Sequence, residues 1–178
     1  MPSLTFFKYH SNGNTCSLHA ILFNQRNVVN RNRSLKMELL HKNITASILQ
    51  SFFNVAKLLP FGLDRSFYIN ALTNDLQQAG FDVQANKLVD IFYNNKVIGQ
   101  LKFDIIVNNA VIIKVDTGFD FINNEQQEKS KIYLKLSQYE VLLLLNFGQE
   151  ADHKRLFLSN DYKQQQQSRY SGYYGTKP

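Results

Sequence analysis

Apolar residues in the first half of the chain recur every three or four positions, which is the spacing of the buried face of an amphipathic helix. Residues 37–59 carry the apolar stripe Leu40, Ile44, Ile48, Phe52, Val55 and Leu59. Residues 64–79 carry the apolar stripe Phe67, Ala71, Leu72 and Leu76. Pro60 and Gly62 lie between the two stripes, and both residue types end helices. We therefore predict two consecutive helices.

Beyond residue 80 the helical spacing gives way to short apolar runs bounded by polar turns. The predicted strands are 88–93, 97–107, 111–115 and 140–147, with a short edge strand at 155–159 and one further helix at 125–136. Two Asn-Asn pairs, at 94–95 and 108–109, separate the first three strands, and asparagine tolerates the positive φ of tight hairpin turns. The order ααβββαβ(β) predicts an α/β or α+β fold in which helices flank a mixed β-sheet.

Charge is unevenly distributed along the 178 residues, whose formal net charge is +6. Residues 1–37 hold five basic and no acidic side chains, whereas residues 38–149 have a net charge of −1. We divide the chain into a basic, irregular extension (1–36), one domain (37–162) and a low-complexity tail rich in Gln, Tyr and Gly (163–178). Regular patterning begins at Met37, so one interpretation is that the functional protein starts there. The basic ends are either merely solvated or contact nucleic-acid phosphates.

A reducing compartment is expected, because the single cysteine, Cys16, has no internal partner for a disulfide. No apolar run approaches the roughly 18 residues that a membrane-spanning helix needs. We therefore expect a cytoplasmic protein without membrane contact.

From residue 37 to about residue 161 the chain resembles the GxxExxY proteins, a small prokaryotic family assigned to the PD-(D/E)XK nuclease-like superfamily. The segment PFGLDRSFY, which leads into the second helix, contains Gly62 and Tyr68 of the naming motif. FDIIVNNAVIIKVD resembles the catalytic hairpin, and LLLNFG and KRLFLSN resemble the closing segments. The resemblance implies a restriction-endonuclease-like core and an ancestral, metal-dependent nuclease activity.

Departures from the family pattern fall on its charged positions. The resemblance identifies Asp104 as the strand aspartate, which is retained. Arg65 stands where the naming motif has glutamate, and Lys114 stands where the family has its metal-binding glutamate. Asp116 occupies the position of the catalytic lysine, and Lys129 that of a glutamine in the following helix.

Metal-assisted cleavage of phosphodiesters requires carboxylates that hold Mg²⁺ or Mn²⁺, which in turn generates hydroxide. Residues 114 and 116 share one face of their strand, since alternate side chains point the same way. In this sequence Lys114 brings an ammonium to a carboxylate position and would pair with Asp104. We therefore expect Arg65, Asp104, Lys114 and Asp116 to form a salt-bridge cluster in place of a metal site, and expect no cofactor.

The sequence and the family resemblance lead to three hypotheses about function. The leading hypothesis is a catalytically degenerate nuclease-like protein, a pseudoenzyme that binds nucleic acid or a protein partner. In it Arg65, Lys114 and Lys129 hold the phosphates of DNA or RNA, helped by the basic ends. The alternative is an active Mg²⁺- or Mn²⁺-dependent nuclease with a permuted site, in which Asp104 and Asp116 bind the metal and Lys114 is the catalytic lysine. A third hypothesis is a structural subunit of a larger assembly.

Overall fold

The computed structural model describes residues 40–93 and 96–169. The predicted extension 1–36, the Asn-Asn turn at 94–95 and the end of the predicted tail lie outside the described residues. Within these ranges, no helix is both long and apolar enough to cross a membrane.

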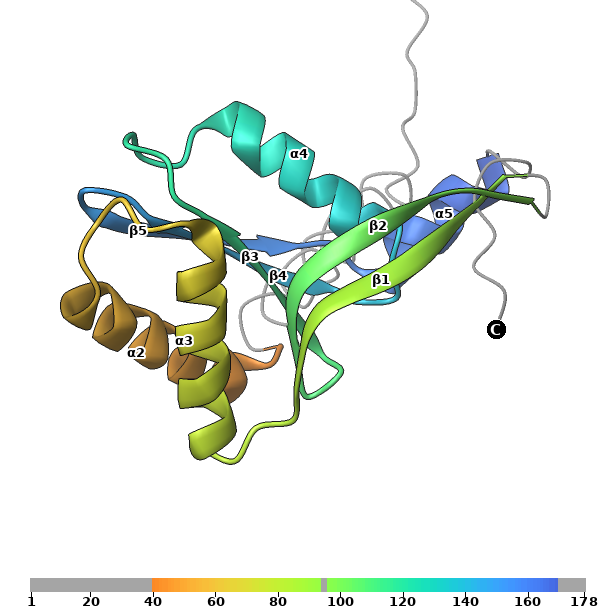
Figure 1. The fold of residues 1–178 in the computed structure, drawn as a ribbon. Helices are drawn as coiled ribbons and strands as arrows, with labels where there is room; N and C mark the ends of the chain where they lie inside the picture. The colour runs from red at the N-terminus through yellow and green to blue at the C-terminus, as the bar shows by residue number, and fades with distance from the viewer. Residues whose placement is uncertain (1–39, 94–95, 170–178) are drawn as a thin grey trace, which may run out of the picture. The chain divides into compact units, whose positions relative to one another are not determined.

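Helices cover both faces of one five-stranded sheet (Figure 1). The helices are α2 (Lys42–Leu58), α3 (Arg65–Gln78), α4 (Asn124–Lys135) and α5 (Asn160–Arg169), and the strands are β1 (Val83–Tyr93), β2 (Lys96–Val107), β3 (Val111–Asp116), β4 (Val141–Phe147) and β5 (Ala151–Phe157). The strand order is β1-β2-β3-β4-β5, with β3 and β4 parallel and the other neighbours antiparallel. This mixed sheet with flanking helices confirms the predicted α+β fold class.

Two hydrophobic clusters lie on opposite faces of the sheet. α2 and α3 pack on one face, where Ile113 and Val115 of β3 join Phe52 and Leu72 of the helices. α4 packs on the other face, where Ile112 of β3 belongs to the second cluster. All seven residues of β4 are buried, as expected for a strand covered on both sides.

The buried stripe of α3 differs from the predicted one. Phe67 was expected to point inward, yet it is 56% exposed, whereas Tyr68 and Ile69 are buried with Leu72 and Leu76. Leu72 and Leu76 are buried and Ala71 packs against the core, as predicted, so the prediction is wrong only at Phe67, whose place in the buried stripe Tyr68 and Ile69 take. Residues 67, 68 and 69 are all apolar, so spacing alone did not distinguish them.

Both edge strands begin earlier than predicted: β1 starts at residue 83, not 88, and β5 starts at 151, not 155. Polar residues at the start of each strand interrupt the apolar alternation, because an edge strand is only partly buried. The turn between β2 and β3 is as predicted, since Asn108 and Asn109 both have positive φ, at 50° and 49°.

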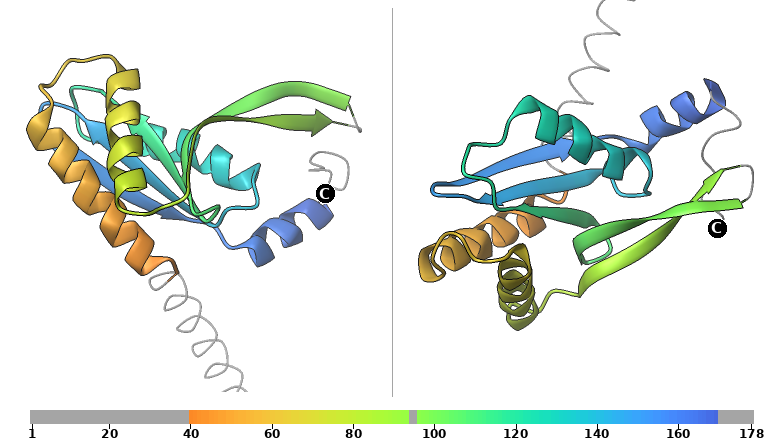
Figure 2. Two further views of the ribbon diagram at one scale, coloured as in Figure 1. Left: turned by 60° about the horizontal axis from the view of Figure 1, so that its bottom comes forward. Right: turned by 45° about the horizontal axis from the view of Figure 1, so that its top comes forward.

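β2 bends away from β3 at Asp104 and continues as a hairpin with β1 alone (Figure 2). Its pairing with β3 runs from Val107 to Ile105 and stops there. Residues two apart on a regular strand face the same side, but Phe103 belongs to the α4 cluster and Ile105 to the α2–α3 cluster. The strand is thus irregular at Asp104, and Asn86, which lies opposite on β1, has a left-handed φ of 55°.

Helix α5 was not predicted, because the segment after residue 162 is too polar to pack. Its anchor is Lys163, which is only 8% exposed. The Lys163 ammonium donates hydrogen bonds to the carbonyl oxygens of Ser137, at 2.9 Å, and Tyr139, at 2.5 Å. One buried lysine therefore holds the start of a helix whose composition indicates disorder.

Burial lowers the pKa of Lys163 to about 8, although the nearby Glu140 carboxylate opposes this shift. Between pH 8 and about 10.5 the unfolded chain keeps a proton at Lys163 that the folded chain has lost, so stability rises with pH in this window. Relative to a Lys163→Met variant, the wild-type free energy of unfolding should increase by about 1–3 kcal/mol from pH 7.5 to 10. Urea denaturation of both proteins at each pH measures this difference, and a constant difference would contradict the assignment.

Candidate functional site

Asp104 fills the gap that β2 leaves when it bends away from β3. Beyond the paired residues of β3, the next backbone N–H and C=O groups that point toward β2 belong to Val115. The Val115 N–H donates a 2.8 Å hydrogen bond to Oδ2 of Asp104 in place of a strand carbonyl. Asp104 is only 3% exposed, so its charge requires a partner inside the protein.

Arg65, the first residue of α3, is that partner. Its Nη2 forms an ion pair with Oδ2 of Asp104, and its Nε donates a 2.7 Å hydrogen bond to the carbonyl oxygen of Val115. The N–H and C=O of one strand residue point to the same side, so both backbone groups of Val115 face the gap. The Arg65–Asp104 pair therefore replaces the missing stretch of β2 as the hydrogen-bonding neighbour of β3.

Lys114 and Asp116 face the opposite side of the sheet, because they alternate with Val115, whose side chain packs in the α2–α3 cluster. Lys114 Nζ donates a 3.1 Å hydrogen bond to the Tyr133 hydroxyl and lies 4.4 Å from the centre of that ring. Oδ2 of Asp116 accepts a 2.7 Å hydrogen bond from Nε2 of Gln126. Both charges are thus engaged by side chains of α4.

The predicted salt-bridge cluster of four residues is therefore wrong in part. Arg65 and Asp104 pair as expected, but no ion pair links Lys114 to Asp104 in the described part of the chain. The physical reason is the bend in β2, which directs Asp104 to α3, whereas Lys114 contacts α4. The prediction assumed a regular strand, and the strand is irregular at this residue.

Lys129, the third predicted phosphate ligand, is 71% exposed and forms a 2.7 Å ion pair with Glu125 on the same helix. The hydrogen bond from Lys129 lowers the pKa of Glu125. Arg65, Lys114 and Lys129 thus each contact a different partner, namely Asp104, Tyr133 and Glu125.

The residues of this site do not fit a divalent cation. The Asp104 carboxylate and the Val115 carbonyl are hard oxygen ligands of the kind that Mg²⁺ prefers, but the guanidinium of Arg65 contacts both. Asp116 is bonded to Gln126 on the other face. Among residues 40–93 and 96–169, no three acidic, histidine or cysteine side chains are grouped so as to hold a metal.

Gln126 is a site residue that the sequence reasoning missed. The Asn123 side chain accepts a hydrogen bond from the Gln126 N–H, and Oε1 of Gln126 accepts one from the Asn123 N–H, which forms a capping box at the start of α4. The cap fixes the Gln126 side chain, so that its Nε2 points to Asp116. The Asn-x-x-Gln spacing before the helix was the signal that could have identified it.

Asn146 was also missed, although it is the one polar residue in the run VLLLLNF. It is fully buried, and its Nδ2 donates hydrogen bonds to the carbonyl oxygens of Gly118, at 3.1 Å, and Asp120, at 2.8 Å. The Asp152 carboxylate accepts a 3.0 Å hydrogen bond from the Ile122 N–H. These bonds fix the β3–α4 loop, residues 117–123, against β4 and β5.

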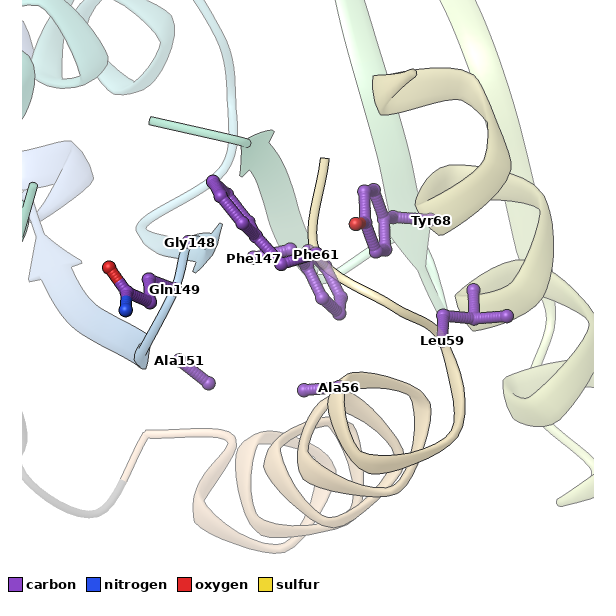
Figure 3. A pocket seen from close by; sticks show the side chains of 8 residues that line it. All are labelled: Ala56, Leu59, Phe61, Tyr68, Phe147, Gly148, Gln149 and Ala151. Carbon is purple, nitrogen blue, oxygen red and sulfur yellow. The ribbon is translucent and has the colours of Figure 1, made fainter. Parts of the chain in front are cut away.

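A small pocket of about 140 Å³ lies between α2, α3 and the β4–β5 turn (Figure 3). Its lining residues are Ala56, Leu59, Phe61, Tyr68, Phe147, Gly148, Gln149 and Ala151. The Tyr68 hydroxyl is used internally, since it donates to the Pro60 carbonyl at 2.7 Å and accepts from the Leu63 N–H at 3.3 Å. The surface of the pocket is mixed, with polar atoms exposed beside the apolar and aromatic side chains.

A family model described as PD-(D/E)XK nuclease superfamily matches residues 42–156. Comparisons with curated proteins and with solved structures give no match. The matched region contains Arg65, Asp104, Lys114 and Asp116 and extends from α2 to β5.

Replacing Arg65 by alanine should leave the buried Asp104 carboxylate without its cation and lower the free energy of unfolding by about 1–3 kcal/mol. The Arg65→Ala and Asp104→Ala effects should also be non-additive, because the residues form one unit. Urea denaturation of both variants and the double variant measures the coupling. Lys129→Ala is the matched control, since it removes a lysine whose ion pair is solvent-exposed. An Arg65→Ala effect no larger than that of Lys129→Ala would contradict the assignment.

Proposed function

The chain belongs to the PD-(D/E)XK nuclease superfamily, and we propose that it is a GxxExxY-like member that has lost metal-dependent cleavage and acts by binding a partner. The proposal covers a nucleic-acid- or protein-binding module. The observation that carries it is the position of the Arg65 guanidinium, which contacts the Asp104 carboxylate and the Val115 carbonyl together.

Electrostatics supports this proposal. A divalent cation beside Asp104 would also lie close to the positive charge of Arg65, and the repulsion at a few ångströms is on the order of several kcal/mol at an effective dielectric constant near 20. A cation could bind only if Arg65 moved away, and that movement would leave the Val115 carbonyl without its hydrogen bond. Lys114 stands where the family has a carboxylate, but its ammonium contacts Tyr133 on the other side of the sheet and does not add to this repulsion.

An active nuclease with a permuted site requires Asp104 and Asp116 to converge on one ion. In the structure Asp104 contacts Arg65 of α3, and Asp116 contacts Gln126 of α4. Both carboxylates would have to exchange these partners for the metal. The separate engagement of the two carboxylates therefore favours binding over cleavage.

A protein partner is better supported than a nucleic acid. Arg65 and Lys129 have acidic partners, and Lys114 packs against Tyr133, so the proposed phosphate ligands are not free to act together. Residues 38–149 also have a net charge of −1, which gives little attraction for a polyanion. A subunit of a larger assembly is one form of such a protein-binding role.

Purified protein should not cleave single- or double-stranded DNA or RNA in the presence of Mg²⁺ or Mn²⁺. Gel assays with the wild type and with the Asp104→Ala and Asp116→Ala variants test this expectation, and free Mn²⁺ measured by electron paramagnetic resonance should not fall when the protein is added. Cleavage by the wild type that disappears in both variants would refute the proposal and favour the permuted nuclease.

A further inference from the structure

Exposed aromatic and acidic side chains alternate on three loops near the pocket. Phe61 and Asp64 lie on the α2–α3 loop, Phe119, Asp120 and Phe121 on the β3–α4 loop, and Glu150 on the β4–β5 turn. We call these six residues the aromatic–acidic surface. The rings of Phe61 and Phe119 meet edge to face at 4.8 Å, which joins two of the loops, and Phe61 also lines the pocket.

The exposure of these rings is built into the fold. Phe119 and Phe121 are 77% and 62% exposed, although the loop that carries them is hydrogen-bonded to the buried Asn146. A Cβ atom added at Gly148 would lie 2.5 Å from the carbonyl oxygen of Gly118, so the β4–β5 turn and this loop are in close contact. Large rings held in water on a fixed loop are typical of a binding surface.

Charge indicates the kind of partner. Asp64, Asp120 and Glu150 are exposed, and none of them forms an ion pair among the residues that the structure describes. The neighbouring Arg65 does not balance them, because its guanidinium is paired with Asp104. One exposed cation, Lys57 in the last turn of α2, precedes the loop that carries Phe61 and Asp64, against the three exposed acids of the surface. The surface therefore repels phosphates and attracts a basic partner.

We propose that the aromatic–acidic surface docks a basic segment of another protein, which inserts one large apolar side chain into the pocket of Figure 3. Cavities of roughly 150 Å³ accept a benzene-sized group, so a pocket of about 140 Å³ suits one leucine or phenylalanine side chain. Lysine or arginine residues that flank this anchor pair with Asp64, Asp120 and Glu150. The inference rests on the proposed binding function and names its partner class.

Selection of random peptides displayed on phage against the full-length protein tests this inference. Enriched peptides should share one large apolar residue close to two or more lysines or arginines. For a synthetic copy of an enriched peptide, Phe61→Ala with Phe119→Ala should weaken binding about tenfold or more, as expected for an anchor site. Ile98→Ala is the matched control, because Ile98 is 65% exposed on the β1–β2 hairpin and lies outside the surface.

Charge is tested separately with Glu150→Lys, which should weaken the same peptide several-fold at low salt, and with Asp82→Lys as a control outside the surface. Enrichment of acidic peptides, or no enrichment at all, would overturn the inference. Equal losses of peptide affinity in the Phe61/Phe119 and Ile98 variants would also overturn it. So would displacement of the peptide by single-stranded DNA or RNA at a concentration equal to or below that of the peptide. Thermal unfolding of each variant verifies that it is folded. Metal-dependent cleavage would refute the proposed function instead, so the two failures are distinguishable.

Discussion

A strand that leaves its neighbour exposes backbone N–H and C=O groups that must find other hydrogen-bond partners. β2 leaves β3 at Asp104, and the exposed groups belong to Val115. An ion pair between two side chains satisfies both groups, with Asp104 accepting from the N–H and Arg65 donating to the carbonyl. This arrangement ties the first residue of α3 to the middle of the sheet and holds a buried carboxylate in place.

The same bend determines which charges can meet. Lys114 and Asp116 flank Val115 and therefore face α4, where Tyr133 and Gln126 engage them. The four charges of the predicted cluster are thus divided between the two layers of helices, with Arg65 and Asp104 on the α3 side and Lys114 and Asp116 on the α4 side. What remains at the surface is an excess of acidic groups on the loops, because the nearby guanidinium is used inside.

Features that depend on local pattern were predictable from the sequence, and features that depend on one irregular residue were not. Apolar runs predicted the mixed sheet and the fully buried β4, and the Asn108-Asn109 pair predicted its turn. The separation of Lys114 from Asp104 could not be predicted, because alternation along β2 gives the wrong face for the irregular residue Asp104. The helix α5 was missed for a similar reason, since long-range hydrogen bonds of Lys163 and Asn160 hold its start.

The proposed loss of a metal site would involve more than one residue. Arg65, Lys114 and Asp116 each have a different internal partner, namely Asp104 of β2, Tyr133 of α4 and Gln126 of α4. A glutamate at position 65 alone would place two carboxylates at the gap and remove the donor to the Val115 carbonyl. It would also leave the Lys114 ammonium in contact with Tyr133. A cation site would therefore require several changes together, whereas binding through the neighbouring loops requires none of them.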